Sequence, residues 1–195
     1  MKDIISDVKS AAFGLSVPIM RDESADALVF LTGVKRPKKI LEIGTGIGYS
    51  GILMLTAAEE AFLTTVEIDC ASARLAKENF ARAGLTSRVR VIEGDAAEAA
   101  VMLDSRFDLI LIDGAKGQYE RLRPYLAGLL NRGGTIFADN VLFKGYVKGG
   151  YPGHKHRTIV KSLSAFIKNM KDDAGFNTEL KEIGDGVLIA EKISD

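Results

Sequence analysis

Acidic side chains close two apolar runs of this 195-residue sequence, where they could hold a cation. Asp113 ends the run Phe107–Asp113, and Asp139 with Asn140 ends the run Thr135–Asp139. If the runs are neighbouring strands, two carboxylates and an amide oxygen converge, and without compensation one carboxylate would take up a proton. Three oxygen ligands suit Mg²⁺, or another hard divalent cation, better than zinc. The alternative is that each aspartate only caps a helix.

A lysine follows the first of these carboxylates closely. Lys116 lies three residues beyond Asp113 and would project into the same cleft. A lysine that lies beside a cation and is partly removed from water loses its proton more readily, so Lys116 is a candidate general base. The alternative is an ordinary surface lysine.

A glycine-rich segment, Leu41–Ser50, follows the first apolar run and opens a helical pattern. Glycines let the backbone turn sharply near a ligand, and a helix N-terminus presents free N–H groups to an anion. The pattern Gly-x-Gly-x-x-Gly that begins at Gly46 matches the dinucleotide fingerprint, with Glu67 about 20 residues further on. Glu42 argues against a dinucleotide, because a carboxylate there would repel a pyrophosphate and attract an ammonium group.

Two more carboxylates would complete a nucleoside site. Glu67 ends the second apolar run and could accept hydrogen bonds from both hydroxyls of a ribose. Asp95 follows the third run, beside Ala96, and could accept one from an adenine amino group. Ligands of open α/β sheets bind at the carboxyl ends of the strands, where all these acids fall. The alternative is a structural turn with surface acids.

The elements that must position these residues alternate between apolar runs and amphipathic helical patterns. The runs are uninterrupted rather than alternating, which is typical of strands buried on both faces of a parallel sheet. This rhythm predicts a doubly wound α/β fold. The expected parallel strands are Lys39–Ile43, Phe62–Ile68, Val89–Glu93, Phe107–Asp113 and Thr135–Asp139.

The C-terminal part has a different pattern. An apolar helix face runs from Ile159 to Met170, and the strands Thr178–Ile183 and Val187–Lys192 then flank the turn Gly184–Gly186. This spacing predicts a final antiparallel hairpin. The segment before the helix, Leu142–Arg157, is expected to be irregular.

Composition places further bounds on the chain. Apolar residues make up 47% of the sequence, and 26 basic residues balance 26 acidic ones, so no global charge recruits nucleic acid or membrane. The single cysteine excludes an internal disulfide. The first residues lack the apolar stretch of a signal peptide, and no run is long enough to span a membrane. We expect one cytoplasmic domain, residues 1–195, with residues 1–36 as a helical segment packed on the core.

The segment Lys144–Arg157 carries no acidic residue. Lys144, Lys148 and Arg157 are candidate substrate contacts, and tyrosines at 146 and 151 are interleaved with the basic residues. Basic and aromatic side chains together suit phosphate contacts and stacking on an exposed RNA base. The alternative is a solvated lid over a small substrate.

Six motifs carry a resemblance to a known family. LEIGTGIGYSG, TTVEID, EGDA, LIDGAKGQY, GGTIFADNVLFKG and GDGVLIAEK together resemble the metal-dependent O-methyltransferases of the catechol and caffeoyl-CoA type, from about Val17 to Lys192. VPIM, DGAKGQY and DNVLFKG look most similar to bacterial tRNA 5-hydroxyuridine methyltransferases. The resemblance implies a seven-stranded class I methyltransferase fold, S-adenosylmethionine as cofactor and a homodimer. Only 17 residues precede Pro18, fewer than relatives usually carry.

The resemblance also implies roles for individual residues. Asp113, Asp139 and Asn140 would bind the metal, and Lys116 would act as base beside Asp113. The residues that would contact the cofactor are Met20, Glu42, Gly44, Gly48, Ser50, Glu67, Asp95, Ala96 and Asp113.

The expected reaction is methylation of a hydroxyl that lies beside a second oxygen, because a metal held in this way chelates vicinal oxygens. The expected substrate is the wobble 5-hydroxyuridine of tRNA, which would become 5-methoxyuridine. The alternative is a small catechol-like or caffeoyl-CoA-like acceptor. Two other classes stay open at this point, an NAD-dependent oxidoreductase and a non-catalytic RNA-binding domain.

Overall fold

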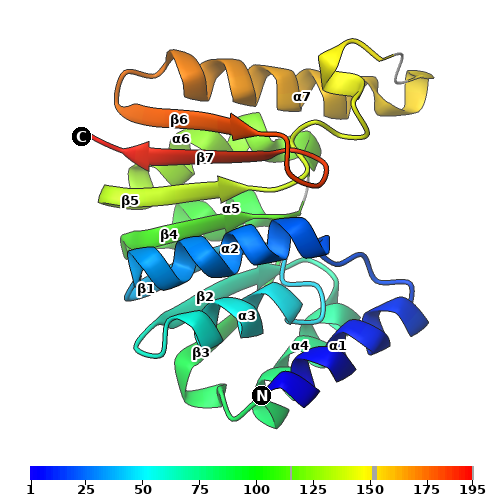
Figure 1. The fold of residues 1–195 in the computed structure, drawn as a ribbon. Helices are drawn as coiled ribbons and strands as arrows, with labels where there is room; N and C mark the ends of the chain where they lie inside the picture. The colour runs from blue at the N-terminus through cyan, green and yellow to red at the C-terminus, as the bar shows by residue number, and fades with distance from the viewer. Residues whose placement is uncertain (115, 151–152, 195) are drawn as a thin grey trace.

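The computed structural model describes residues 1–114, 116–150 and 153–194, and its centre is one seven-stranded sheet (Figure 1). The strand order is β3-β2-β1-β4-β5-β7-β6, with β1 to β5 parallel and β7 antiparallel to both of its neighbours. This order confirms the expected mostly parallel sheet with a C-terminal hairpin. The strands are β1 Lys39–Ile43, β2 Phe62–Glu67, β3 Val89–Glu93, β4 Phe107–Ile112, β5 Leu130–Ala138, β6 Phe176–Lys181 and β7 Val187–Lys192.

Helices cover both faces of the sheet, which explains the uninterrupted apolar runs (Figure 1). In β4, Ile110 and Ile112 face one buried cluster, whereas Leu109 and Leu111 face the other. Both sets of side chains therefore leave water, and neither face needs polar residues. On one face lie α1 Lys2–Gly14, α2 Asp22–Lys35, α3 Tyr49–Ala57 and α4 Cys70–Arg82; on the other lie α5 Ala96–Met102, α6 Tyr119–Leu129 and α7 Gly153–Asp172.

The register brings the ends of the central strands to one level. Ile43 of β1 pairs with Ile112 of β4, and Ile112 pairs with Ala138 of β5. The ladder continues one residue further, since Asp113 N donates to Ile43 O at 2.9 Å and Asp139 N donates to Ile112 O at 3.0 Å. Asp113 and Asp139 are thus held side by side by backbone pairing.

The turn of the C-terminal hairpin packs against the segment that follows β5. Val141 N donates to Gly186 O at 2.9 Å, and Leu142 N donates to Asp185 O at 3.0 Å. Gly186 has a φ of +86°, and a Cβ there would lie 2.3 Å from Leu142 Cγ. A glycine is therefore required for this close approach.

The segment Leu142–Arg157 is not irregular throughout, so that expectation was wrong. A 3₁₀ turn, η3, covers Tyr146–Lys148, and α7 already begins at Gly153. In the first turn of α7, His154 and Lys155 are exposed, so no apolar period marks this turn in the sequence. The other described 3₁₀ turns are η1 Thr86–Arg88 and η2 Lys116–Gln118. Within the described ranges, none of the helices has the length and apolar character needed to cross a membrane.

Gly51 tests the packing of α3 against the sheet. A Cβ at Gly51 would lie 2.8 Å from side-chain atoms of both Leu63 and Phe80. We expect Gly51→Ala to lower the free energy of unfolding by about 1–3 kcal/mol, because an extra methyl group overpacks a filled core. Urea unfolding measures the change.

Gly128 in α6 is the matched control. A Cβ there meets no described atom within 4 Å. Gly128→Ala should leave stability unchanged or raise it by up to about 1 kcal/mol, because alanine favours a helix. Equal unfolding curves for Gly51→Ala and the wild type would contradict the close packing of Gly51 against Leu63 and Phe80.

Candidate active site

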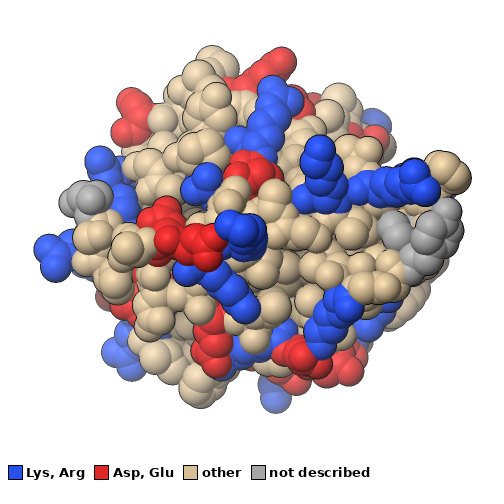
Figure 2. Space-filling model, turned by 90° about the horizontal axis from the view of Figure 1, so that it is seen from above, with Lys and Arg blue, Asp and Glu red and all other residues tan. Residues whose placement is uncertain are grey.

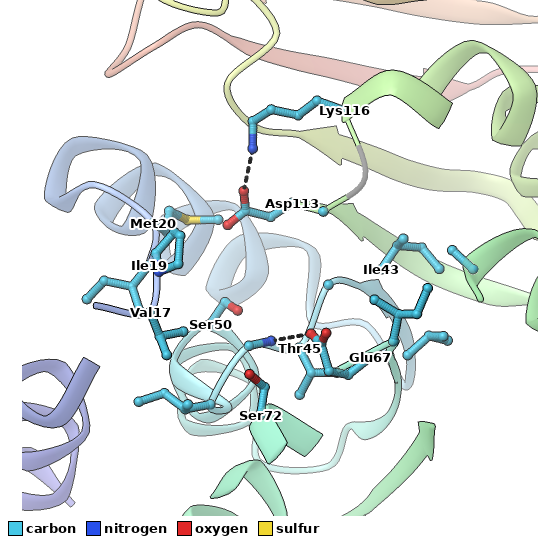
Figure 3. A pocket seen from close by; sticks show the side chains of 18 of the residues that line it. Val17, Ile19, Met20, Ile43, Thr45, Ser50, Glu67, Ser72, Asp113 and Lys116 are labelled. Carbon is cyan, nitrogen blue, oxygen red and sulfur yellow. Dashed lines mark hydrogen bonds and ion pairs between the residues drawn. The ribbon is translucent and has the colours of Figure 1, made fainter. Parts of the chain in front are cut away.

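A cavity of about 450 Å³ opens at the carboxyl ends of the parallel strands (Figure 3). Its volume falls in the range of small-molecule sites. The segment before α2 covers one side of it through Val17, Ile19 and Met20. The residues expected to contact a cofactor that do line the cavity are Met20, Gly44, Ser50, Glu67, Asp95, Ala96 and Asp113; Lys116 lines it as well.

The two glycines expected at the cofactor have different roles. Gly44 has a φ of +96°, and a Cβ would lie 2.9 Å from the backbone carbonyl of Asp113. It therefore lets the end of β1 approach the end of β4. Gly48 is not among the described residues that line the cavity; it precedes α3 with a φ of +90° and packs on Phe80.

Glu67 is oriented by the backbone at the end of β2. Its Oε2 accepts a hydrogen bond from Gly46 N at 2.8 Å, and its Oε1 accepts one from Asp69 N at 2.9 Å (Figure 3). Each carboxylate oxygen retains a second lone pair. The carboxylate can therefore accept two ligand hydroxyls in a fixed orientation.

Asp95 caps α5 and faces the same cavity. The amide of Ala97, at 2.8 Å from Oδ1, is the main reason that the pKa of Asp95 is lowered. Gln118 Nε2 lies 3.4 Å from Asp95 Oδ2. Gln118 also lines the cavity, and its Oε1 is buried without a hydrogen-bond partner in the described part of the chain. This amide oxygen is a second acceptor that the sequence did not reveal.

Glu42 lies behind the cavity wall rather than in it. Its side chain is fully buried, Oε1 accepts from Ser50 Oγ, and Oε2 accepts from Thr65 Oγ1 at 2.6 Å. Thr65 shares a further hydrogen bond with Thr45, which lines the cavity. Burial raises the pKa of Glu42 to about 7, although the two hydroxyls favour its charged form. The structure therefore places Glu42 as a support for Ser50 and Thr45.

Asp113 and Lys116 face each other across the upper end of the cavity (Figure 3). Lys116 Nζ is 3.8 Å from Asp113 Oδ1. Burial raises the pKa of Asp113 to about 7; the charge of Lys116 opposes the rise and the charge of Asp139 adds to it. The electrostatic effect of Asp139 on Asp113 follows from the shared strand register.

Asp139 is fully buried and uses only one of its carboxylate oxygens. Oδ1 accepts from Ser24 Oγ at 2.9 Å and from Asn140 N at 2.8 Å. Oδ2 is buried and has no hydrogen-bond partner among the described residues. Burial raises the pKa of Asp139, while the Asn140 amide and the Ser24 hydroxyl favour its charged form. A buried carboxylate oxygen without a partner fits a ligand to a cation.

Asn140, the third expected oxygen ligand, has a left-handed conformation with a φ of +54° that asparagine tolerates better than most residues. Within the described ranges, no three His, Cys, Asp or Glu side chains form a group that could hold a metal. The candidate set is instead two carboxylates and one amide, which is the donor chemistry of Mg²⁺ rather than of zinc.

Two positioning contacts have partners far away in the sequence. Ser24 lies 115 residues before Asp139. Tyr119 OH is 3.0 Å from Ile112 O and 3.1 Å from Asp139 O. No sequence signal points to either contact, because each depends on how a helix packs against the end of β5.

The basic residues expected to contact a substrate lie outside the cavity wall as the described residues define it. Lys144, Lys148 and Arg157 are not among the described residues that line the cavity. Lys148 forms an ion pair with Glu182, and Lys144 N donates to Asp185 Oδ1 at 2.7 Å. Acidic residues of the hairpin therefore lie against a segment that has none itself. Figure 2 shows both signs of charge interspersed on the face seen from above. The expected Tyr151 lies outside the described residues.

Comparisons with known proteins identify the family and the fold. The family model described as O-methyltransferase matches residues 2–193. A Mycobacterium tuberculosis protein provisionally named an O-methyltransferase is 32% identical over 166 residues, which make up 84% of this chain and 73% of that protein.

Two solved structures have the same fold over nearly the whole chain. A Staphylococcus aureus protein provisionally named a caffeoyl-CoA O-methyltransferase is 31% identical with a TM-score of 0.89, and the match covers 96% of this chain and 91% of that one. A Podospora anserina methyltransferase bound to S-adenosylhomocysteine is 25% identical with a TM-score of 0.87, and the match covers 99% and 88%.

The burial of Glu42 predicts a specific dependence of stability on pH. The folded pKa of about 7 exceeds the ordinary value of 4.5, so folding favours the protonated carboxyl. The protonated Glu42 carboxyl stabilises the folded protein fully at a pH below 4.5, the pKa in the unfolded chain. This stabilisation is lost as the pH rises through about 7, the pKa in the folded protein. Glu42→Gln cannot ionise. Relative to the wild type, the variant should therefore gain up to about 3 kcal/mol between about pH 5 and about pH 8.

Urea unfolding of the protein without cofactor measures this difference. Glu60→Gln is the control, since Glu60 is exposed between α3 and β2. If the difference in free energy of unfolding between Glu42→Gln and the wild type stays constant with pH, folding does not raise the pKa of Glu42.

Proposed function

The chain belongs to the O-methyltransferase family, and we propose that it methylates a hydroxyl of a small molecule with a second oxygen beside it, using S-adenosylmethionine and a divalent cation. The observation that carries the proposal is the buried Asp139 Oδ2, which has no partner in the described structure and lies at the strand end beside Asp113. The family membership removes the dehydrogenase alternative.

The cavity offers a partner for each polar part of S-adenosylmethionine. Glu67 would accept the ribose hydroxyls, and Asp95 with Gln118 would accept the adenine amino group. Gly44 and Ser50, supported by the buried Glu42, would hold the methionine end. The Podospora anserina methyltransferase binds the demethylated cofactor in the same fold, which supports this assignment.

Asp113, which lines the cavity, would hold Mg²⁺ together with Asp139 and Asn140, which follow the neighbouring strand β5. When bound, the cation would acidify the acceptor hydroxyl and orient its neighbouring oxygen. Lys116, whose Nζ is 3.8 Å from Asp113 Oδ1, would accept the hydroxyl proton. The acceptor oxygen then bonds to the methyl carbon as the carbon–sulfur bond breaks, and S-adenosylhomocysteine leaves with the former bonding pair on sulfur.

A small acceptor fits the observations better than tRNA does. The Staphylococcus aureus relative is named for a caffeoyl-CoA substrate, and none of the relatives described above is named for RNA. Lys148, expected to contact phosphate, is paired with Glu182. This ion pair reduces the positive charge that Lys148 could offer to a phosphate backbone.

Methyl transfer from labelled S-adenosylmethionine distinguishes the acceptors. We expect label in catechol or caffeoyl-CoA when Mg²⁺ is present, none after treatment with EDTA, and recovery when Mg²⁺ is restored. Label in total tRNA but not in the small acceptors would overturn the proposed substrate. Full activity in EDTA would overturn the proposed cation.

Asp139 can be tested apart from cofactor binding. Asp139→Asn keeps the shape but removes the charge, so methyl transfer should fall by about 100-fold or more. Binding of S-adenosylhomocysteine, measured by calorimetry, should change little because Asp139 is not among the described residues that line the cavity. Asp172→Asn, at an exposed ion pair with Lys168, is the control and should retain activity. An active Asp139→Asn enzyme would exclude Asp139 as a metal ligand.

Lys116→Met should lower kcat by about 100-fold, because a positioned base contributes at least this factor. The residual rate should rise steadily with pH, since hydroxide then removes the proton. Lys168→Met, in the exposed pair with Asp172, is the control. A kcat equal to that of the wild type would leave Lys116 without a role in proton transfer.

A further inference from the structure

We infer that Ser24 and Tyr119 are positioning residues that hold Asp139 from opposite faces of the sheet, so that its Oδ2 is presented to a divalent cation. The inference rests on the proposed function, since it assigns these two residues to the proposed cation site. Neither residue lines the cavity as described, so each acts through Asp139.

Ser24 determines which oxygen of Asp139 stays available. It lies on α2, is fully buried, and its Oγ donates to Asp139 Oδ1 at 2.9 Å. The Asn140 amide donates to the same oxygen at 2.8 Å. Both described donors are therefore on Oδ1, and they fix the rotation of the carboxylate. Without the Ser24 hydroxyl, the carboxylate could turn and share the Asn140 amide between its two oxygens.

Packing prevents the Ser24 hydroxyl from turning away. A Cβ at Gly184 would lie 2.7 Å from Ser24 Oγ, so the backbone of the hairpin turn lies directly against it. Ala25 and Leu28, on the same helix, are buried in the core beneath. The contact is therefore held by α2 on one side and by the turn between β6 and β7 on the other.

Tyr119 fixes the backbone that carries Asp139. Its ring is fully buried on α6 and meets the ring of Phe166 edge-on at a centroid distance of 5.6 Å. Its hydroxyl lies 3.0 Å from Ile112 O and 3.1 Å from Asp139 O. One hydroxyl thus bridges the ends of β4 and β5, just where Asp113 and Asp139 leave the sheet.

The two contacts come from different layers of the fold. In Figure 1, α2 lies in front of the sheet and α6 lies behind it. Ser24 orients the carboxylate of Asp139, and Tyr119 holds the main-chain carbonyl of the same residue. Groups that orient metal ligands commonly change metal affinity by about 10- to 100-fold when removed.

Binding of Mn²⁺ to the cofactor-free protein, followed by electron paramagnetic resonance, tests Ser24 without any turnover. Ser24→Ala should raise the Kd for Mn²⁺ by about tenfold or more. Thr32→Ala is the matched control, because Thr32 is a buried hydroxyl of the same helix that bonds only to Leu28 O among the described contacts. It should bind Mn²⁺ as the wild type does.

Tyr119→Phe removes only a hydroxyl and should also raise the Kd for Mn²⁺ by about tenfold. Tyr125→Phe, on the same helix but exposed, is its control. Thermal unfolding without metal separates the effects: a variant that loses stability but keeps wild-type Mn²⁺ affinity contradicts a positioning role. If both variants bind Mn²⁺ normally, the inference is wrong and the proposed function stands. If the wild type binds no Mn²⁺, both are wrong.

Discussion

The site depends on keeping two carboxylates side by side away from water. Backbone pairing continues past the ends of β4 and β5, so Asp113 and Asp139 have no freedom to separate. Burial and mutual repulsion raise the pKa of Asp113, and Lys116 supplies a nearby positive charge that opposes the rise. Such an arrangement is costly in a protein interior unless a cation compensates it. The rest of the site can be understood as support for this pair.

Much of that support comes from residues that no ligand would touch. Glu42 is buried behind the cavity and bonds to Ser50 and Thr65, so the wall beside Gly44 is rigid. Gly44 in turn permits the close approach of β1 to the backbone of Asp113. At the carboxyl edge of the sheet, residues such as Ser50 therefore face the cavity, and buried residues such as Glu42 orient them. Preorganisation of this kind is what methyl transfer requires, since the reacting atoms must be aligned before reaction.

The C-terminal hairpin connects this edge to the segment that follows it. Its turn bonds to Val141 and Leu142, directly after Asn140, and packs on Ser24. The same hairpin brings Glu182 to Lys148 and Asp185 to Lys144. One element therefore contacts both the residues that follow Asn140 and the basic segment.

The sequence by itself determined the sheet, because apolar runs, glycines and strand-end acids are local patterns. It also placed Asp113, Asp139 and Lys116 at one edge, since parallel strands end together. Only the tertiary structure decided that Glu42 lies behind the wall, that Gln118, Ser24 and Tyr119 belong to the site, and that the basic segment meets acids. Several of those contacts join residues that are far apart in the chain, such as Ser24 and Asp139. Their distances depend on strand order and helix packing, which no local pattern encodes.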